Sequence, residues 1–564
     1  MEPSDAASIA IFASRLQVQV ADHGSSKFLL RDISFQIPSG HFTAIVGPSG
    51  CGKSTLLKCL TGVQPPTGGH LLLGGHPVAA IKNDFPLAIG YLPQYSSAHD
   101  NLTIGEILRF GIALRLPGSI DQGVKDRWRS HLSSLAGIDS LLNQPYHTLS
   151  GGQRRRAALA EELIGDPPFL FLDELTSGLD PQAELEMMCW LRDLAHERQK
   201  TVMIVTHSVA NLHLCDSILF LGKGRLLYQG PYSDLLPTTG AETLEALYTA
   251  ASSGAFSLPD GESHEEPAPA PQQLKTARPP GGWSQWPVLL HRQLILQFRD
   301  KPQLWLHLIL ILTFPCLVAV FATNGLPQVR DLGLNLEKNV VTTLQDNLSY
   351  LQESFSAGSL ISSLVMFQVI LLALMGANNG AREIAKERGI LDKELRVGVS
   401  PGAYVFTKFF VCCVLSAIQA FWMTGFVKWI CGFPGDFGAQ GLILFALTLA
   451  LSCSCLAISA ASKSPERASL LAIYLVGLQL PLSGAILALP DIVSTISQPF
   501  IGSYWAWSGY LKTLQSFRHY DIVQQITHTT ISSFYLSLGV LGLHVVLSMG
   551  LAWYFTLRGR NHPS

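Results

Sequence analysis

Charged side chains are scarce in this sequence. Asp, Glu, Lys and Arg together make up 14% of the 564 residues, whereas soluble domains average about 25%. The scarcity is uneven, because residues 1–280 have an ordinary mixture and the chain beyond residue 300 contains long apolar runs. The formal net charge is −2, which gives no electrostatic argument for a nucleic acid partner. The composition therefore predicts a soluble part followed by a membrane part.

Organised cysteine pairs are also missing. The 10 cysteines are scattered, and no C-x₂-C pair is followed by a second pair at the spacing of a metal site. Cys412, Cys413, Cys453 and Cys455 lie inside apolar segments, which is typical of buried thiols. The first residues lack a basic region and a long apolar core, so they do not resemble a secretory signal. We expect a cytosolic N-terminal part without disulfides.

A complete phosphate-binding loop stands near the N-terminus. An apolar run over 42–46 precedes it and a helical pattern over 54–60 follows, which is the strand–loop–helix context that the motif G-x-x-x-x-G-K-[ST] requires. Glycines allow backbone N–H groups to turn toward phosphate oxygens, and the helix N-terminus adds favourable partial charge. Lys53 would reach the β- and γ-phosphates, and Ser54 would bind Mg²⁺. The loop consists of Gly47, Pro48, Ser49, Gly50, Cys51, Gly52, Lys53, Ser54 and Thr55.

Two carboxylates follow a second apolar run. The run covers 169–172 and ends at Asp173 and Glu174. Asp173 would hold Mg²⁺, directly or through water, and Glu174 would polarise the water that attacks the γ-phosphate. Short β-rich runs at 42–46, 169–172 and 201–206 alternate with helical patterns over 11–235, which predicts an α/β domain with a partly parallel sheet.

A third motif, Leu149-Ser150-Gly151-Gly152-Gln153, opens another helix, where Ser150 and the glycine N–H groups could bind a γ-phosphate. With Gln94 in Tyr91-Leu92-Pro93-Gln94 and His207 in Thr206-His207-Ser208, five motifs occur in order, and residues 12–235 resemble the ATP-binding cassette family. The resemblance implies an α/β P-loop fold with ATP and Mg²⁺ as cofactors.

The resemblance also assigns roles to particular residues. Gln94 looks like the lid glutamine that contacts Mg²⁺ and senses the membrane domain, and His207 looks like the switch histidine at the γ-phosphate. The loop that ends at Asp180 looks like the one that crosses the dimer interface. The signature residues Ser150, Gly151, Gly152 and Gln153 would complete the site of a second chain. The expected catalytic residues are thus Glu174, His207 and Gln94.

The sequence departs from the family where an aromatic residue often stacks on adenine. The stretch 18–23 holds no aromatic residue, which leaves His23, Phe28 or no residue in that role.

Six apolar segments in the second half are each near the ~20 residues that a bilayer requires. They cover 303–323, 357–377, 403–425, 439–461, 468–488 and 535–557. Basic residues gather at 378–402, 462–467 and the C-terminal tail, so those parts are expected in the cytosol and 324–356, 426–438 and 489–534 outside. We expect a nucleotide-binding domain over 1–250, a flexible linker over 251–282, an amphipathic connecting helix over 283–302 and an all-α six-span domain over 303–564.

This domain order resembles the G subfamily of white-type half-transporters and their bacterial ABC-2 type relatives. The resemblance implies a multi-pass membrane protein that uses ATP to export or flip a lipophilic or lipid-like substrate. It also implies a coupling helix over 381–388, with Glu383, Lys386 and Arg388, and a substrate path between spans two and five. Residues proposed to line that path are Met366, Phe367, Leu371, Leu478, Leu480 and Leu487.

Other interpretations remain open at this point. The cargo could be a polysaccharide, or the chain could be a membrane-bound ATPase that regulates a partner without moving cargo. One set of motifs and one membrane domain imply a dimer. Because no motif is degenerate, a homodimer is favoured over a heterodimer, with membrane lipids and a small lipophilic substrate as further partners.

Overall fold

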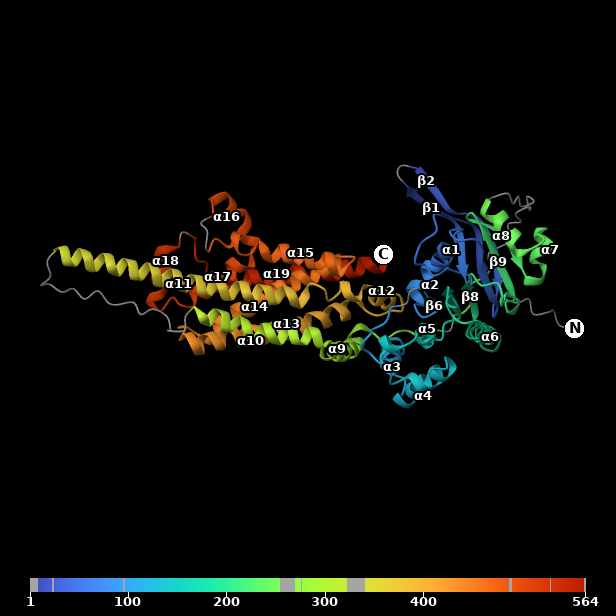
Figure 1. Ribbon diagram of the computed structural model, residues 1–564, viewed down its shortest axis with the longest axis horizontal. Helices are drawn as coiled ribbons and strands as arrows, with labels where there is room; N and C mark the ends of the chain where they lie inside the picture. The colour runs from blue at the N-terminus through green and yellow to red at the C-terminus, as the bar shows by residue number, and fades with distance from the viewer. Residues whose placement is uncertain are drawn as a thin grey trace. The chain divides into compact units, whose positions relative to one another are not determined.

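The structure, a computed structural model, describes residues 9–561 except 23–24, 95–96, 254–268, 275, 322–339, 486–488 and 528. These residues form two compact units. The cassette unit extends to Arg292 and also includes Asp392–Ser400, whereas the membrane unit consists of Gln293–Leu391 and the chain from Pro401 onward. Figure 1 labels the helices and strands of both units.

Two sheets form the centre of the cassette unit. The larger sheet has the order β10-β9-β3-β8-β7-β6, in which β9, β3, β8, β7 and β6 run parallel and β10 pairs antiparallel with β9. Its strands are β3 (Phe42–Val46), β6 (Ile89–Leu92), β7 (Phe169–Asp173), β8 (Thr201–Val205), β9 (Ser217–Gly222) and β10 (Arg225–Gly230). Every residue of β3, β7 and β8 is buried, as expected for parallel strands covered on both faces.

The smaller sheet is antiparallel, with the order β2-β1-β4-β5. It is formed by β1 (Ile9–Asp22), β2 (Ser25–Pro38), β4 (Gly68–Leu73) and β5 (His76–Pro77). The predicted strands at 42–46, 169–172 and 201–206 are confirmed by β3, β7 and β8.

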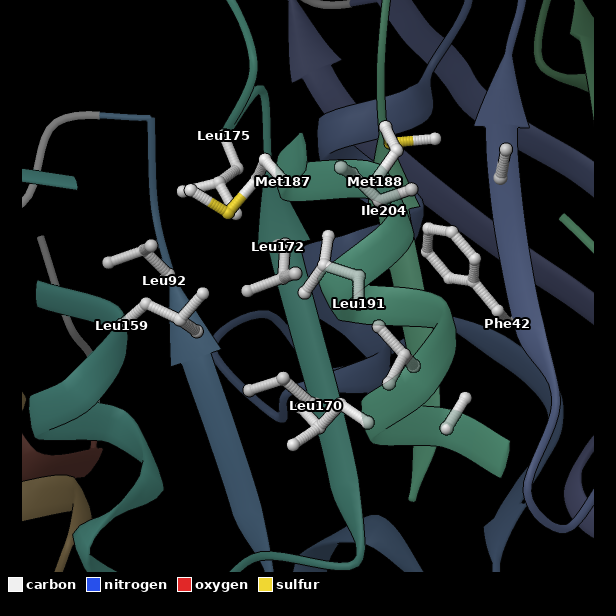
Figure 2. Close-up of a cluster of buried hydrophobic side chains, with 14 of the residues drawn as sticks. Phe42, Leu92, Leu159, Leu170, Leu172, Leu175, Met187, Met188, Leu191 and Ile204 are labelled. Carbon is white, nitrogen blue, oxygen red and sulfur yellow. The ribbon is translucent and has the colours of Figure 1, made fainter. Parts of the chain in front are cut away.

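Helices of the cassette unit pack on these sheets or, in the case of α3 and α4, on other helices. They are α1 (Lys53–Leu60), α2 (Val78–Asp84), α3 (Ile104–Arg115), α4 (Gln122–Leu135), α5 (Gly151–Glu162), α6 (Pro181–Arg198), α7 (Leu235–Thr239) and α8 (Leu244–Ser253). Figure 2 shows Leu191 of α6 and Leu159 of α5 over Leu170 and Leu172 of β7. This apolar layer removes the helices' inner faces from water, which is the main favourable term in folding.

Helix α9 (Gly282–Arg299) agrees with the predicted connecting helix. Five further helices among the described residues are long and apolar enough to cross a membrane. They are α10 (Lys301–Val320), α11 (Val340–Gly380), α13 (Pro401–Cys431), α14 (Phe437–Ala461) and α19 (Phe534–Asn561). They lie side by side in Figure 1, and α14 packs against α11, α13 and α19.

The predicted fifth span, 468–488, is wrong as a single membrane-crossing helix. Helix α15 (Pro465–Gly477) has only 13 residues and is followed by a 3₁₀ turn, Pro481–Ser483. Gly484 then adopts a left-handed φ of 71°. Proline lacks the N–H that a helix requires and glycine adopts a left-handed φ without steric cost, so the helix stops short. Apolar composition alone suggested a span that the backbone interrupts.

The segment predicted as external, 489–534, also differs. It contains α16 (Asp491–Ser497), α17 (Gly502–Lys512) and α18 (Arg518–Ile526). Helix α17 packs against α11, α14 and α19, with Trp507 and Tyr510 fully buried. An 11-residue helix is about 17 Å long and cannot cross the ~30 Å hydrocarbon core. This segment is therefore helical and packs into the membrane unit's core, without a helix long enough to cross the bilayer.

The predicted coupling helix over 381–388 is wrong in its bounds. Residues 381–384 form bends and turns, Ala385–Glu387 is a 3₁₀ turn, and the helix proper is α12, Arg388–Arg396. Gly380 ends α11, and the chain turns before the charged residues begin.

Close contact between α11 and α14 depends on two glycines. Gly376 and Gly380 are four residues apart and so share one face of α11. A methyl group at Gly376 would lie 2.6 Å from the carbonyl oxygen of Thr448, and one at Gly380 would collide with the carbonyl oxygen of Ser452. Beside them, Asn379 donates to Oε1 of Gln419 at 2.9 Å and accepts from its Nε2 at 3.1 Å.

Replacing Gly380 with alanine should destabilise the membrane unit. Alanine favours helices over glycine by about 1 kcal/mol, but overpacking a close helix contact costs about 1–3 kcal/mol. We therefore expect a lower thermal unfolding temperature in detergent for Gly380→Ala. Gly550→Ala on α19 is the matched control, because no heavy atom lies within 4 Å of the added methyl group. Equal unfolding temperatures for the two variants would contradict this packing argument.

Candidate nucleotide-binding site

The phosphate loop connects β3 to α1. Gly47, Gly50 and Gly52 have φ values of 144°, 75° and 108°, which side chains rarely adopt. Added methyl groups would collide with the carbonyl oxygen of Leu221 at Gly47 but would meet no atom within 4 Å at Gly50. The loop thus rests against the sheet on one side and is open on the other.

Lys53 lies at the base of this loop and is only 6% exposed. Its ammonium group donates to the carbonyl oxygens of Gly47 at 2.8 Å and Pro48 at 2.9 Å. No carboxylate pairs with it among the described residues. Helix α1 begins at Lys53 without a side-chain cap, so its first N–H groups lack that partner. A buried cation and an uncapped helix N-terminus in an open glycine loop fit a phosphate group.

Two oxygen donors meet beside the loop. Ser54 donates from Oγ to Oδ1 of Asp173 at 3.4 Å, and Asp173 is the last residue of β7. Burial and the neighbouring Glu174 raise the pKa of the Asp173 carboxyl, so an added cation would favour its ionised form. A hydroxyl and a carboxylate are oxygen ligands of the kind that Mg²⁺ takes, and the pair fits that ion.

Glu174 joins the two other residues expected to act in catalysis. Gln94 donates from Nε2 to Oε2 of Glu174 at 2.7 Å, and Nε2 of His207 lies 3.0 Å from Oε1. These residues follow β6, β7 and β8, which are neighbours in the parallel sheet, so their carboxyl ends meet at one edge. Glu174 has a left-handed φ of 52° and donates its N–H to the Val205 carbonyl oxygen at 3.0 Å. The structure thus brings together three residues that the sequence places far apart.

The signature residues lie at the start of α5. Ser150 Oγ accepts from the Gln153 N–H at 3.4 Å, and Gln153 Oε1 accepts from the Ser150 N–H at 3.0 Å, which forms a capping box. Asp180 caps α6 by accepting from the Ala183 N–H at 3.0 Å. These hydrogen bonds are local to the two helix starts, and within the described part of the chain none of them reaches the phosphate loop.

Sequence reasoning did not identify Arg155. Its guanidinium donates to the carbonyl oxygen of Leu175 at 3.0 Å and also to that of Ser177. It therefore connects the signature helix to the loop that ends at Asp180. Arginine occupies each of the positions 154–156, and the sequence alone does not indicate which of the three contacts that loop.

Phe28, one of the two residues considered for stacking on adenine, lies on β2 and is 43% exposed. The Arg31 guanidinium lies 5.7 Å from its ring centre. His23 lies outside the described residues.

The segment Asp392–Ser400 belongs to the cassette unit, and sequence reasoning missed its contacts. Nζ of Lys393 lies 2.8 Å from Oε2 of Glu161 and 3.1 Å from Oε1 of Glu162, at the end of α5. Burial raises the pKa of Glu161, but Lys393 and Arg115 outweigh it and hold that pKa below its ordinary value. The Glu161 carboxylate is therefore ionised at neutral pH, and its contact with Lys393 is a buried ion pair.

A second contact of this segment reaches the strand before Gln94. The Arg396 guanidinium lies 5.2 Å from the ring centre of Tyr91 on β6. The Tyr91 N–H also donates to Oε2 of Glu162 at 3.3 Å. The three residues predicted for coupling bond inside the membrane unit instead: Glu383 with Lys408 at 3.2 Å, Lys386 with Asp300 at 2.7 Å, and Arg388 with the Ala460 carbonyl at 2.9 Å.

Comparisons with known proteins agree with this geometry. The ABC transporter family matches residues 30–177, and the ABC-2 type transporter family matches residues 284–511. The ABC transporter ATP-binding/permease protein Rv1747 of Mycobacterium tuberculosis is 28% identical over 478 residues, which cover 82% of this chain and 53% of that protein. The chain thus spans about half the length of this relative.

Two other relatives match less than half of this chain. The aliphatic sulfonates import ATP-binding protein SsuB of Pseudomonas fluorescens is 34% identical over 261 residues, 45% of this chain and 91% of that protein. ABC transporter G family member 8 of Arabidopsis thaliana is 37% identical over 211 residues, 37% of this chain and 35% of that protein. The chain therefore belongs to the ABC transporters, a family whose cassettes hydrolyse ATP to drive transport, and is an integral membrane protein with a cytosolic cassette and an ABC-2 type membrane domain.

Proposed function

We propose that two copies of this chain form an ATP-driven transporter that exports or flips a lipophilic, lipid-like substrate. The observation that carries the ATP-driven part is the position of Glu174, held between Gln94 and His207 beside the phosphate loop. A carboxylate at the end of β7 whose two oxygens are each held by a neighbouring side chain is suited to accept a proton from an attacking water.

The cassette residues then divide the work of hydrolysis. Lys53 would exchange its loop carbonyls for phosphate oxygens, and Glu174 would orient and deprotonate the water. His207 would hold Glu174 and contact the γ-phosphate. Ser54, Asp173 and Gln94 would hold Mg²⁺, which when bound neutralises phosphate charge.

Dimerisation is part of the proposal because one chain does not complete the site. Ser150 and Gly151 lie at an exposed helix start, and the capping hydrogen bonds of Ser150 stay within that helix start rather than reaching the phosphate loop of the same chain. A helix N-terminus of this kind is suited to a phosphate on another chain. Since Lys53, Glu174 and His207 are all present, two identical chains would give two competent sites, which supports a homodimer.

A cavity in the membrane unit supports the substrate class. It has a volume of about 920 Å³ and lies among α10, α11 and α15. Leu306, Ile370, Leu374 and Ile473 are among its apolar lining residues, and Arg382 and Lys386 line it as well. A cavity with both kinds of lining suits an amphiphile better than a polysaccharide, which would require many hydrogen-bond partners.

Of the residues predicted to line the substrate path, Leu480 lines this cavity. Met366 and Leu371 are instead buried between helices, and Phe367 packs against that apolar core. Leu478 is exposed without lining the cavity, and Leu487 lies outside the described residues.

Coupling is proposed to run through Asp392–Ser400. Lys393 contacts the end of α5 whose other end carries Ser150, and Arg396 contacts Tyr91, three residues before Gln94. Movement of this segment would thus reach both the signature and the lid glutamine.

The ATPase proposal is tested with Glu174→Gln in lipid nanodiscs, across a panel of lipids and amphipathic compounds. We expect at least a 100-fold loss of hydrolysis, because loss of a general base costs about 10²–10⁴ in rate, with nucleotide binding retained. Glu242→Gln, at an exposed position of the cassette unit, is the control and should hydrolyse ATP normally. ATP hydrolysis by Glu174→Gln at the wild-type rate would contradict the proposed role of Glu174 as the general base.

The dimer is tested separately by native mass measurement of the same sample. A mass of two identical chains supports the proposal, and activity that appears only with a subunit of different mass would favour a heterodimer.

The coupling proposal is tested with Arg396→Gln, which removes a cation–π contact worth about 0.5–2 kcal/mol. We expect basal hydrolysis to persist while the amount of substrate moved per ATP falls. Arg225→Gln is the matched control, because Arg225 is exposed on β10 and does not line the cavity. An equal fall in Arg225→Gln would contradict a role for Arg396 in coupling.

A further inference from the structure

A groove of about 380 Å³ on the cassette unit has no part in the ATP site. It lies among α3, α4 and α9, and its polar lining is mostly basic. The lining includes Arg109 from α3, Lys125, Asp126 and Arg129 from α4, and His291 from α9. Figure 1 shows α3 and α4 next to one another.

The positive charges of this groove are not balanced. Nη2 of Arg129 lies 3.4 Å from Oδ1 of Asp126, so the one carboxylate that lines the groove is already paired with Arg129. Arg109 lies over the Phe110 ring with its guanidinium 5.0 Å from the ring centre, and no carboxylate pairs with Arg109 or Lys125 within the described part of the chain. Two cations are thus available to an anion that enters the groove.

The helix wall of the groove continues as an apolar face. Pro287 and His291 line the groove, and Leu294 and Phe298 follow at the helical spacing that places them on the same side of α9. Leu294 is 42% exposed and Phe298 is 69% exposed. Three residues after Phe298 the first membrane helix, α10, begins at Lys301. One helix therefore carries a basic groove and, toward the bilayer, exposed apolar side chains.

We propose that this groove binds the anionic head group of a phospholipid in the cytosolic leaflet, while Leu294 and Phe298 contact its acyl region. The order of charge and apolar surface along α9 matches the order of phosphate and acyl chain in the lipid. A free phosphate would use the cations but would gain nothing from the apolar face. This lipid is a bound partner of the cassette unit and is distinct from the cargo.

The test uses the full chain in phosphatidylcholine nanodiscs doped with phosphatidylglycerol that carries a photoreactive head group. Crosslinked peptides are mapped, and the yield on α3, α4 and α9 is titrated against the lipid fraction. The groove variant is Arg109→Gln/Lys125→Gln. The matched control, Arg127→Gln/Arg225→Gln, removes the same charge from exposed positions that do not line the groove. ATP hydrolysis reports that each variant is folded.

Wild type and control should crosslink at these helices with the same half-saturation. The groove variant should require roughly 30-fold more lipid, since each surface cation contributes about 1 kcal/mol and 1.4 kcal/mol is tenfold. An unchanged titration in an active groove variant would overturn the proposal. Equal protection by millimolar glycerol 3-phosphate would also overturn it, because the groove would then be a site for soluble anions.

Discussion

The cassette's function depends on one carboxylate, that of Glu174, and on the two side chains that hold it. Gln94, Glu174 and His207 follow three neighbouring parallel strands, and Glu174 takes part in both hydrogen bonds, so a small shift at the end of β7 changes both. The left-handed backbone of Glu174 turns its side chain away from the strand direction, and its bond to Val205 keeps that turn in place. The apolar layer around Leu170 and Leu172 fixes the strand that ends there.

Helix α5 has the signature residues at its start and contacts the segment Asp392–Ser400 at its end. Its 12 residues, about 18 Å of helix, run from the exposed cap at Ser150 to the acids Glu161 and Glu162 at the other end. The acids hold Lys393, and Glu162 also holds the backbone of Tyr91. A buried ion pair loses its favourable energy if one partner leaves, because the remaining charge is then desolvated and unpaired. This contact is therefore suited to transmit movement rather than to absorb it.

The parts that the sequence predicted well are those in which chemistry is local. The phosphate loop, the Asp173–Glu174 pair and the strands around them are contiguous motifs, and each lies on the expected element. The fifth span failed because apolar composition does not show where Pro481 and Gly484 break a helix. Helix α17 was missed because its 11 residues are too few for the length expected of a span, and only the packing shows Trp507 and Tyr510 buried. Arg155 and Lys393 could not be predicted, since their importance lies in partners that are distant in sequence.

Transport by the purified chain is the most direct test of the central claim. The chain would be reconstituted alone into liposomes with a fluorescent lipid analogue, and its leaflet distribution would be followed after ATP addition. The account predicts ATP-dependent movement of the analogue without any other protein. ATP hydrolysis at a normal rate with no movement of any lipid-like compound would contradict it, and would favour an ATPase that acts on a partner.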